Sequence, residues 1–335
     1  MKVGIVGLPN VGKSSLFNLL THAGAQVAKF PFTTIDRNIG MVAIPDERIE
    51  KIVEITKSPK MKYASIEFLD IAGLIKDAHK GEGLGNKFLA HIRDVDLVVH
   101  VLRCFTAPDV AYTSCQLSPA GDREIVLTEL LLADLEIVER RIDKIKKAAE
   151  YRDELLLLEK IKNDLACGKV PSSSLPADLP LLAVKPEIVV LNLDDEGRFC
   201  NDQDGYRLSV GLEEEIADFT QEEKEELRKD AGLDPGGVDG LIKLCLNRLS
   251  IMIFYTIKGE EARAWPVPVG TKVFEAAGKI HTDMQRGFIK AEILSYSDFM
   301  KCGGFAEAQN RGCTKIEGKE YALQDGDIVL IKFRA

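Results

Sequence analysis

The residues between Gly7 and Ser14 have the types and spacing of a phosphate-binding loop. The run Gly7-Leu8-Pro9-Asn10-Val11-Gly12-Lys13-Ser14 fits the pattern G-x-x-x-x-G-K-[ST] without a gap. It directly follows the apolar run Lys2–Val6 and precedes an expected helix at Ser15–Leu20, so it would join a strand to a helix. Glycines let backbone N–H groups point at a phosphate, and a helix N-terminus adds a favourable partial charge.

The loop predicts how its side chains would contact a nucleoside triphosphate. Lys13 should reach the β- and γ-phosphates, and the Ser14 hydroxyl should ligate Mg²⁺. The other expected nucleotide contacts are Asn10, Val11, Gly12 and Ser15. Asn10 has a further interpretation, because an Asn at this position resembles P-loop proteins in which K⁺ bridges the phosphates. The alternative is that the Asn10 side chain only stabilises its own loop.

Two later segments could complete the metal site. Asp70-Ile71-Ala72-Gly73 ends an apolar run, where the Asp70 carboxylate can hold Mg²⁺ through water and the Gly73 N–H can donate to the γ-phosphate. Between the loop and this segment lies Phe30-Pro31-Phe32-Thr33-Thr34. A Thr here commonly completes the Mg²⁺ shell, and the spacing favours Thr34 over Thr33.

A glycine-rich segment follows Asp70 and bears on the hydrolysis rate. Gly81-Glu82-Gly83-Leu84-Gly85 can be ordered by a γ-phosphate and released after hydrolysis. Ras-like proteins orient the attacking water with a Gln, but that position is Leu74 here. We therefore expect slow intrinsic hydrolysis that a partner accelerates by ordering the loop from Leu74 to Phe88. His79 is a candidate catalytic helper, and the alternative is an ordinary solvent-exposed His.

A base-recognition segment is expected where a later strand ends. Asn192-Leu193-Asp194-Asp195 occupies that place. Compared with the Asn-Lys-x-Asp of GTPases, Leu193 replaces the Lys whose stem covers the base, and Asp195 keeps an acceptor in the guanine-reading position. Ser209, after the next short strand, is expected in a second base loop.

Apolar runs indicate the fold that positions these residues. They are rich in Val, Ile and Leu and are separated by helical stretches, which predicts a parallel sheet in an α/β domain. The expected strands are Lys2–Val6, Ser65–Ile71, Leu97–Leu102 and Ile188–Leu191, with Met41–Ile44 as a further candidate.

A heptad-like stripe between Asp122 and Cys167 predicts a different element. The stripe breaks near Tyr151–Asp153, which favours two helices folded back as a hairpin that is inserted between strands of the first domain. The alternative is an amphipathic helix lying on the sheet. Further helices are expected at Glu213–Phe219, Gln221–Ala231 and Val238–Leu249.

The last part of the chain predicts a small α+β module. Short strands are expected at Ile251–Thr256, Gly287–Ile293 and Asp327–Phe333, with a helix at Val273–Ile280. The expected domains are therefore a first part of the nucleotide-binding domain at 1–115, an inserted hairpin at 116–180, a second part at 181–250 and the C-terminal module at 251–335.

Composition limits the class of protein. The formal net charge is -9, which argues against a general nucleic-acid coat protein and against DNA as a partner. The residues after Ser250 are nearly neutral, with 12 basic and 11 acidic side chains. No apolar run is long enough to span a bilayer, and the seven scattered cysteines do not form a disulfide framework. We therefore expect reduced thiols, no membrane contact and a cytoplasmic location.

Several of these motifs together resemble the Obg-like ATPase family, the YchF group of P-loop GTPase relatives. The similarity covers the whole chain and is carried by the loop, by Asp70–Leu74 and by five further segments. These are Pro31–Ile35, Gly81–Leu89, His100–Phe105 with Arg263–Trp265, and Gln324–Asp327. The resemblance implies a G domain, an inserted helical hairpin and a C-terminal TGS domain of β-grasp type. It also implies an ATP preference and association with ribosomes or translation factors.

Two positions depart from that family. Its usual Asn-x-x-Glu is Asn192-Leu193-Asp194-Asp195 here, and the shorter acid would allow a guanine contact. A His expected a few residues after Phe105 is Tyr112. The sequence therefore predicts a nucleotide-dependent switch that binds and slowly hydrolyses ATP. The alternatives are a GTPase of the same architecture and a nucleotide-gated scaffold for RNA or ribosomes with negligible hydrolysis. A resemblance to TGS domains suggests an RNA contact for the C-terminal module.

Overall fold

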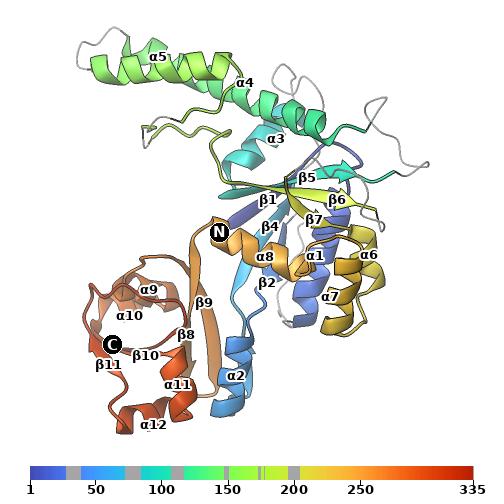
Figure 1. Cartoon of the computed structure of the whole chain (residues 1–335). Coiled ribbons are helices and arrows are strands. Elements are labelled where there is room, and N and C mark those ends of the chain that lie inside the picture. Colours follow the sequence, from blue (N-terminus) through green and yellow to red (C-terminus); the bar gives the residue numbers. More distant parts are fainter. Residues whose placement is uncertain are drawn as a thin grey trace. The chain divides into compact units, whose positions relative to one another are not determined.

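The structure is a computed structural model that describes residues 1–27, 39–71, 84–106, 117–146, 151–172, 175–176, 178–194 and 204–334. These residues form two compact units (Figure 1). One consists mainly of Met1–Thr21 and Glu67–Leu241, and the other mainly of Met41–Ile66 and Ile242–Ala335. The domain boundaries expected from the sequence stay predictions.

The first unit is built on a six-stranded sheet with the order β2-β4-β1-β5-β6-β7. Its neighbours from β4 to β7 pair in parallel, which confirms the predicted parallel α/β sheet. The strands are β1 (Lys2–Val6), β2 (Ile39–Ala43), β4 (Ser65–Asp70), β5 (Leu97–Cys104), β6 (Glu187–Leu193) and β7 (Tyr206–Leu208). Every residue of β5 is buried, including His100 and Arg103, as expected for a central strand covered on both faces.

Most helices that accompany this sheet lie where the sequence predicted them, but one is shifted and the helix at Leu84–Arg93 was not predicted. They are α1 (Lys13–Val27), α3 (Leu84–Arg93), α6 (Val210–Glu215), α7 (Gln221–Asp230) and α8 (Gly237–Arg248). The helix predicted at Glu213–Phe219 instead begins at Val210. The reason is an N-cap, because the Ser209 Oγ accepts a hydrogen bond from the Leu212 N–H at 3.2 Å.

The predicted hairpin is present as α4 (Pro119–Ile145) and α5 (Arg152–Ala166), which lie side by side (Figure 1). Helix α4 begins after Ser118, whose side chain accepts from the Gly121 N–H, with proline in the first helical position. The predicted stripe forms a buried core between the helices. Its members include Leu131, Val138, Ile142, Ile145, Leu158, Ile161 and Leu165.

A buried carboxylate fixes the segment that returns from the hairpin to the sheet. Asp134 on α4 is fully buried, and its two oxygens accept the Leu182 N–H at 2.7 Å and the Ala183 N–H at 2.8 Å. Burial raises the pKa of Asp134 to about 6, although the two hydrogen bonds oppose this shift. At the root of the same helix, Arg123 pairs with Glu187 of β6 at 2.5 Å.

The second unit is built on a mixed sheet with the order β11-β10-β12-β8-β9-β3. The pairs β8–β9, β10–β12 and β10–β11 are antiparallel, whereas β12–β8 and β9–β3 are parallel. The strands are β3 (Lys60–Lys62), β8 (Ile251–Lys258), β9 (Glu261–Pro268), β10 (Phe288–Ser295), β11 (Lys315–Glu317) and β12 (Asp327–Phe333). The helices are α2 (Glu47–Thr56), α9 (Val273–Ile280), α10 (Thr282–Arg286), α11 (Tyr296–Cys302) and α12 (Phe305–Asn310).

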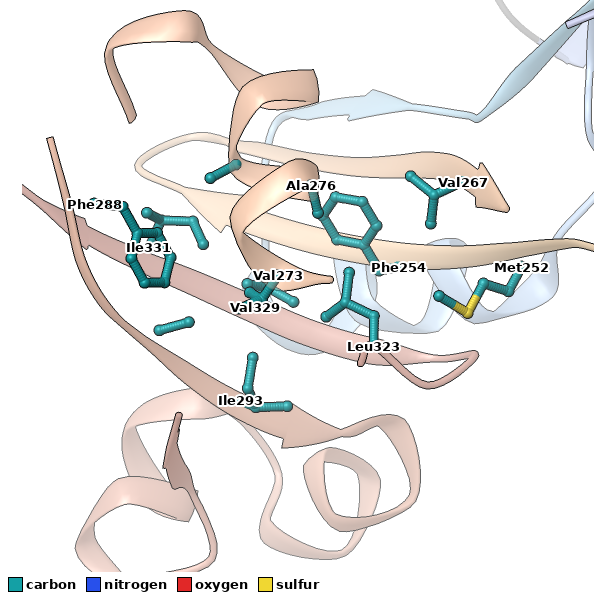
Figure 2. Close-up of a cluster of buried hydrophobic side chains, with 12 residues drawn as sticks. Met252, Phe254, Val267, Val273, Ala276, Phe288, Ile293, Leu323, Val329 and Ile331 are labelled. Carbon is teal, nitrogen blue, oxygen red and sulfur yellow. The ribbon is translucent and has the colours of Figure 1, made fainter. Parts of the chain in front are cut away.

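The core of this unit lies between the sheet and α9. Figure 2 shows Val273 and Ala276 of the helix beside Phe254 of β8 and Val329 of β12. Phe254 is fully buried, and the ring of Trp265 stacks near it with centroids 6.3 Å apart. The α+β module expected from the sequence is therefore confirmed, including its helix at Val273–Ile280.

An ion-pair cluster joins the segment before α2 to the C-terminal strands of the same unit. Arg48 donates to Asp46 at 2.9 Å and to Asp325 at 2.6 Å. The Tyr255 hydroxyl also donates to Asp46, and burial together with this bond raises the pKa of Tyr255 well above its usual value. Sequence reasoning missed α2 and β3, which belong to this arrangement.

Two findings bear on the class of protein. In the described part of the chain, no helix has the length and apolar character needed to cross a bilayer. Cys104 is disulfide-bonded, so the expectation that every thiol is reduced is wrong for this residue. Cys167, Cys245, Cys302 and Cys313 are free.

We expect Asp134→Ala to destabilise the hairpin, because it leaves the Leu182 and Ala183 N–H groups without their acceptors. The predicted loss is about 1–3 kcal/mol in free energy of unfolding, measured by urea denaturation. Asp143→Ala is the matched control on the same helix, since Asp143 is 69% exposed in its side chain and should change stability by less than about 0.5 kcal/mol.

The pH dependence gives a second readout of the same variant. The folded-state pKa of Asp134, about 6, lies above its ordinary value of 3.8. Its titration therefore favours the folded state fully below that ordinary value, and this contribution is lost as the pH rises through about 6. Asp134→Ala should flatten the wild-type decline over this range. An unchanged slope would assign the decline to other groups.

Candidate nucleotide-binding site

The P-loop has the backbone conformation that its glycines predict. Gly7 and Gly12 have φ angles of 150° and 97°, in the region that favours glycine. A Cβ on Gly7 would lie 2.5 Å from the Val101 carbonyl oxygen. A Cβ on Gly12 would lie 2.3 Å from Asn192 Nδ2. Both glycines are therefore required by close neighbours as well as by backbone angle. Asn10 also has a positive φ of 63°.

Lys13 begins α1 and is held inside the loop. Its side chain is 7% exposed, and Nζ donates to the Leu8 carbonyl oxygen at 2.6 Å. Burial lowers the pKa of Lys13, and the nearby Asp70 carboxylate partly opposes this shift. The Leu8 carbonyl thus holds the ammonium group at the loop.

Two of the three residues expected at the metal, Ser14 and Asp70, lie together. Ser14 Oγ donates to Asp70 Oδ2 at 2.7 Å, which joins the start of α1 to the end of β4. The Ile71 N–H donates to the Ile5 carbonyl at 3.1 Å and fixes the strand beside β1. A hydroxyl and a carboxylate are the hard oxygen ligands that Mg²⁺ prefers, so this pair fits the expected ion.

Asn192 braces the loop from β6. Its Nδ2 donates to the Val11 carbonyl at 3.0 Å, and its Oδ1 accepts the Val210 N–H at 3.2 Å. The side chain is 5% exposed. Asn192 therefore joins the P-loop to the start of α6, and both polar ends of its amide are used in doing so.

A cavity of about 340 Å³ opens at this edge of the sheet. Its lining brings together most of the residues expected at the base, along with the residues that follow β5 and the start of α6. They are Gly12, Ser15, Phe105, Thr106, Asn192, Leu193, Asp194, Ser209, Val210, Gly211 and Glu214. The carboxyl ends of parallel strands are where open α/β sheets bind ligands.

Comparison with known proteins agrees with this geometry. Residues 251–334 match a family model for the C-terminal part of YchF-type GTPases, described as a protein of unknown function. Residues 2–149 match a model described as a 50S ribosome-binding GTPase. The "Ribosome-binding ATPase YchF" of Bacillus subtilis is 39% identical over 99% of both chains. The chain belongs to the YchF family.

Two further YchF proteins support this assignment. The "Ribosome-binding ATPase YchF" of Escherichia coli O157:H7 is also 39% identical over 99% of each chain. The solved structure of the Schizosaccharomyces pombe YchF GTPase superposes with a TM-score of 0.85 at 31% identity, covering 99% of this chain and 97% of that one. The resemblance to the YchF group inferred from the motifs is thereby confirmed.

Within this YchF site, the base-recognition residues differ in what they contact. Leu193 is 2% exposed and packs with Leu102, Cys104 and Leu191, so its side chain belongs largely to the core. Ser209 lines the cavity, and its Oγ caps α6. Asp194 also lines the cavity, and its buried Oδ1 has no hydrogen-bond partner among the residues that the structure describes.

Several predicted site residues lie outside the described part of the chain, and the cavity has lining residues that were not predicted. Gly73, Thr34, His79, Asp195 and Tyr112 lie outside the described residues, so their roles stay predictions. Sequence reasoning missed Phe105 and Thr106 as lining residues, and it named Asp194 only as part of the base-recognition segment. The first two directly follow a buried strand, and the rule that ligands bind at the carboxyl edge of a parallel sheet could have found them.

We expect Asn192→Ala to weaken nucleotide binding by about tenfold, because it removes a hydrogen bond that holds the P-loop carbonyl of Val11. The measurement is a titration with a fluorescent nucleotide in the presence of Mg²⁺. Asn247→Ala is the matched control, since Asn247 is exposed on α8. Equal affinity of the Asn192 variant and the wild type would contradict a bracing role.

Proposed function

We propose that this chain is a nucleotide-dependent switch that binds and slowly hydrolyses ATP in the cytoplasm, in association with ribosomes or translation factors. The observation that carries the proposal is that Lys13 and Ser14 of the P-loop lie together with Asp70 at the end of β4. Lys13 is preset by the Leu8 carbonyl, and Ser14 and Asp70 are in contact at 2.7 Å. The names of the YchF relatives support ATP and the ribosome.

The chain's own groups act by positioning and by neutralising charge, which is most of what phosphoryl transfer requires. Lys13 would exchange the Leu8 carbonyl for β- and γ-phosphate oxygens, and the loop amides would donate to the same phosphates. Ser14 and Thr34 would hold Mg²⁺ directly, with Asp70 acting through water. When bound, Mg²⁺ supplies charge neutralisation at the phosphate oxygens. Gly73 would donate its N–H to the γ-phosphate.

Hydrolysis also requires a group that orients the attacking water. Leu74 has no hydrogen-bonding group, so we propose that intrinsic hydrolysis is slow and that a partner accelerates it. His79, in the segment from Leu74 to Phe88, is the candidate side chain for orienting the water. Asn10 is the candidate ligand of a K⁺ ion at the phosphates, and its left-handed backbone places it at the turn of the loop.

The choice of base is the least constrained part of this proposal. Asn192 keeps one N–H and one oxygen lone pair beyond its bonds to Val11 and Val210, so we propose that it also contacts the base. Asp195 would accept from guanine, which would make the chain a GTPase of the same architecture. The relatives named as ATPases favour ATP. A scaffold with negligible hydrolysis is the remaining alternative.

The second unit supplies a proposed RNA contact, together with the β-grasp TGS identity that the resemblance implies. Six basic side chains are distributed along it and could contact phosphates. They are Lys258, Arg263, Lys272, Lys279, Arg286 and Lys290.

Side-by-side titration of ATP and GTP tests the proposed base preference. With Mg²⁺ and K⁺ present, we expect ATP to bind at least about tenfold more tightly, a difference of about 1.4 kcal/mol. Lys13→Ala should abolish measurable binding of both nucleotides and serves as the negative control. Equal or tighter GTP binding would replace the ATPase proposal with the GTPase alternative.

Single-turnover hydrolysis in K⁺ and in Na⁺ tests Asn10. A bridging cation at the phosphates acts as an arginine finger does, so the rate should be higher in K⁺. Asn10→Ala should remove the difference without abolishing nucleotide binding. Equal wild-type rates in the two salts would exclude the K⁺ hypothesis. Absence of any hydrolysis would favour the scaffold.

A further inference from the structure

A second cavity, of about 360 Å³, lies in the second unit. Its volume falls within the range of about 300–1,000 Å³ that is typical of small-molecule sites. It is lined by the outer ends of β8 and β9, by the junction of α9 with α10 and by Phe333 of β12. None of these residues takes part in the nucleotide site described above.

Strand register explains why this cavity has an aromatic and cationic wall. Phe254 lies opposite Trp265, Thr256 opposite Arg263 and Lys258 opposite Glu261. Directly opposed residues of an antiparallel pair share a face, and alternate residues of each strand share it too. The face therefore begins in the buried core at Phe254, as Figure 2 shows, and ends at the exposed Lys258.

Three planar groups are stacked on that face. The rings of Phe254 and Trp265 are nearly parallel, at 14°, and the Arg263 guanidinium lies 3.9 Å from the centroid of the Trp265 ring. Trp265 is held further by its Nε1–H, which donates to Thr256 Oγ1 at 2.9 Å. The stack orients the guanidinium, and a guanidinium plane is a surface on which nucleobases stack.

The charges around the stack suit an anion with polar substituents. Arg263 and Lys258 form no ion pair with any described residue. Glu261 is paired with Lys62 at 2.7 Å, which offsets its charge. Asp283 lies beside His281, with 3.4 Å between its Oδ2 and the imidazole Nδ1, and stays exposed at the rim. A carboxylate there can accept a hydrogen bond from an amine or a hydroxyl.

We propose that this cavity binds one unstacked nucleotide of single-stranded RNA. The base stacks on the open face of the Arg263 guanidinium, the phosphate pairs with Lys258, and Asp283 accepts from a base amine or the ribose 2′-hydroxyl. The shared chemistry is that of a nucleoside phosphate. RNA is the source favoured by the ribosome-binding names of the relatives, so the inference rests on the proposed function and assigns its RNA contact to one site.

Fluorescence offers a direct test, because Trp265 is the one Trp in the chain. The full-length protein is titrated with short oligoadenylate and oligouridylate strands, and the emission of Trp265 is followed. We expect a saturable change on RNA addition. Arg263→Lys keeps the charge but removes the planar surface, so affinity should fall about tenfold. Arg311→Lys, at an exposed arginine of the same unit, should bind as the wild type does.

A second pair of variants keeps the test decisive if Arg263→Lys unfolds the unit. Lys258→Ala removes an exposed side chain and should weaken RNA binding severalfold and lower its salt dependence. Lys229→Ala on α7 is the matched control and should leave binding unchanged. Far-ultraviolet circular dichroism checks that every variant is folded.

The outcomes separate this inference from the proposed function. RNA binding that is unaffected by either pocket variant overturns the site while leaving RNA contact elsewhere in place. RNA is overturned as the occupant if adenosine monophosphate binds as tightly as the RNA. It is also overturned if oligoglutamate changes the fluorescence of Trp265 and RNA does not. ATP titration of the same proteins reports on the P-loop separately. Failure there would refute the proposed ATPase and leave the pocket result standing.

Discussion

The geometry of the nucleotide site depends on one side-chain amide. Asn192 holds the Val11 carbonyl with its nitrogen and the Val210 N–H with its oxygen, so a single planar group fixes the loop against the start of α6. A buried amide whose donor and acceptor are both satisfied is rigid, because rotating it would leave polar groups unpaired. This brace also explains Gly12, since any side chain there would displace the Asn192 nitrogen. The loop conformation is therefore determined from β6 as much as by its own sequence.

Much of the first unit could be predicted because its determinants are local. The strand Lys2–Val6 and the P-loop are continuous in sequence. An apolar run that is followed by a glycine-rich turn is compatible with few local structures. The hairpin was predictable for the same reason, since its stripe repeats along the helices themselves. Asp134 was not singled out, because its partners are backbone groups 48 and 49 residues away.

The parts that sequence reasoning missed depend on distant residues. Arg48 is 277 residues from Asp325, and Asp46 is 209 residues from Tyr255, so no periodicity links the members of this cluster. The sequence assigned Asn192 to the base alone, and the structure adds hydrogen bonds from its amide to the P-loop and to α6. That difference follows from the approach of the P-loop to β6, which only the folded chain reveals. Arg263 could be named as a basic residue, but its stack on Trp265 requires both to lie on one face of β9, a strand that the sequence analysis did not predict.

The second unit contains a short strand, β3, that lies about 200 residues before the other strands of its sheet in the sequence. Strand β3 pairs with β9 from residues 60–62, and the cluster around Arg48 joins the same early segment to β8 and to the turn before β12. A fragment that starts at Ile251 would lose both. Its β9 would become an open sheet edge, and Tyr255 would lose its carboxylate partner. The C-terminal region is thus not an independent domain. A recombinant fragment of residues 251–335 would be prone to self-association and would not reproduce this unit of the intact protein.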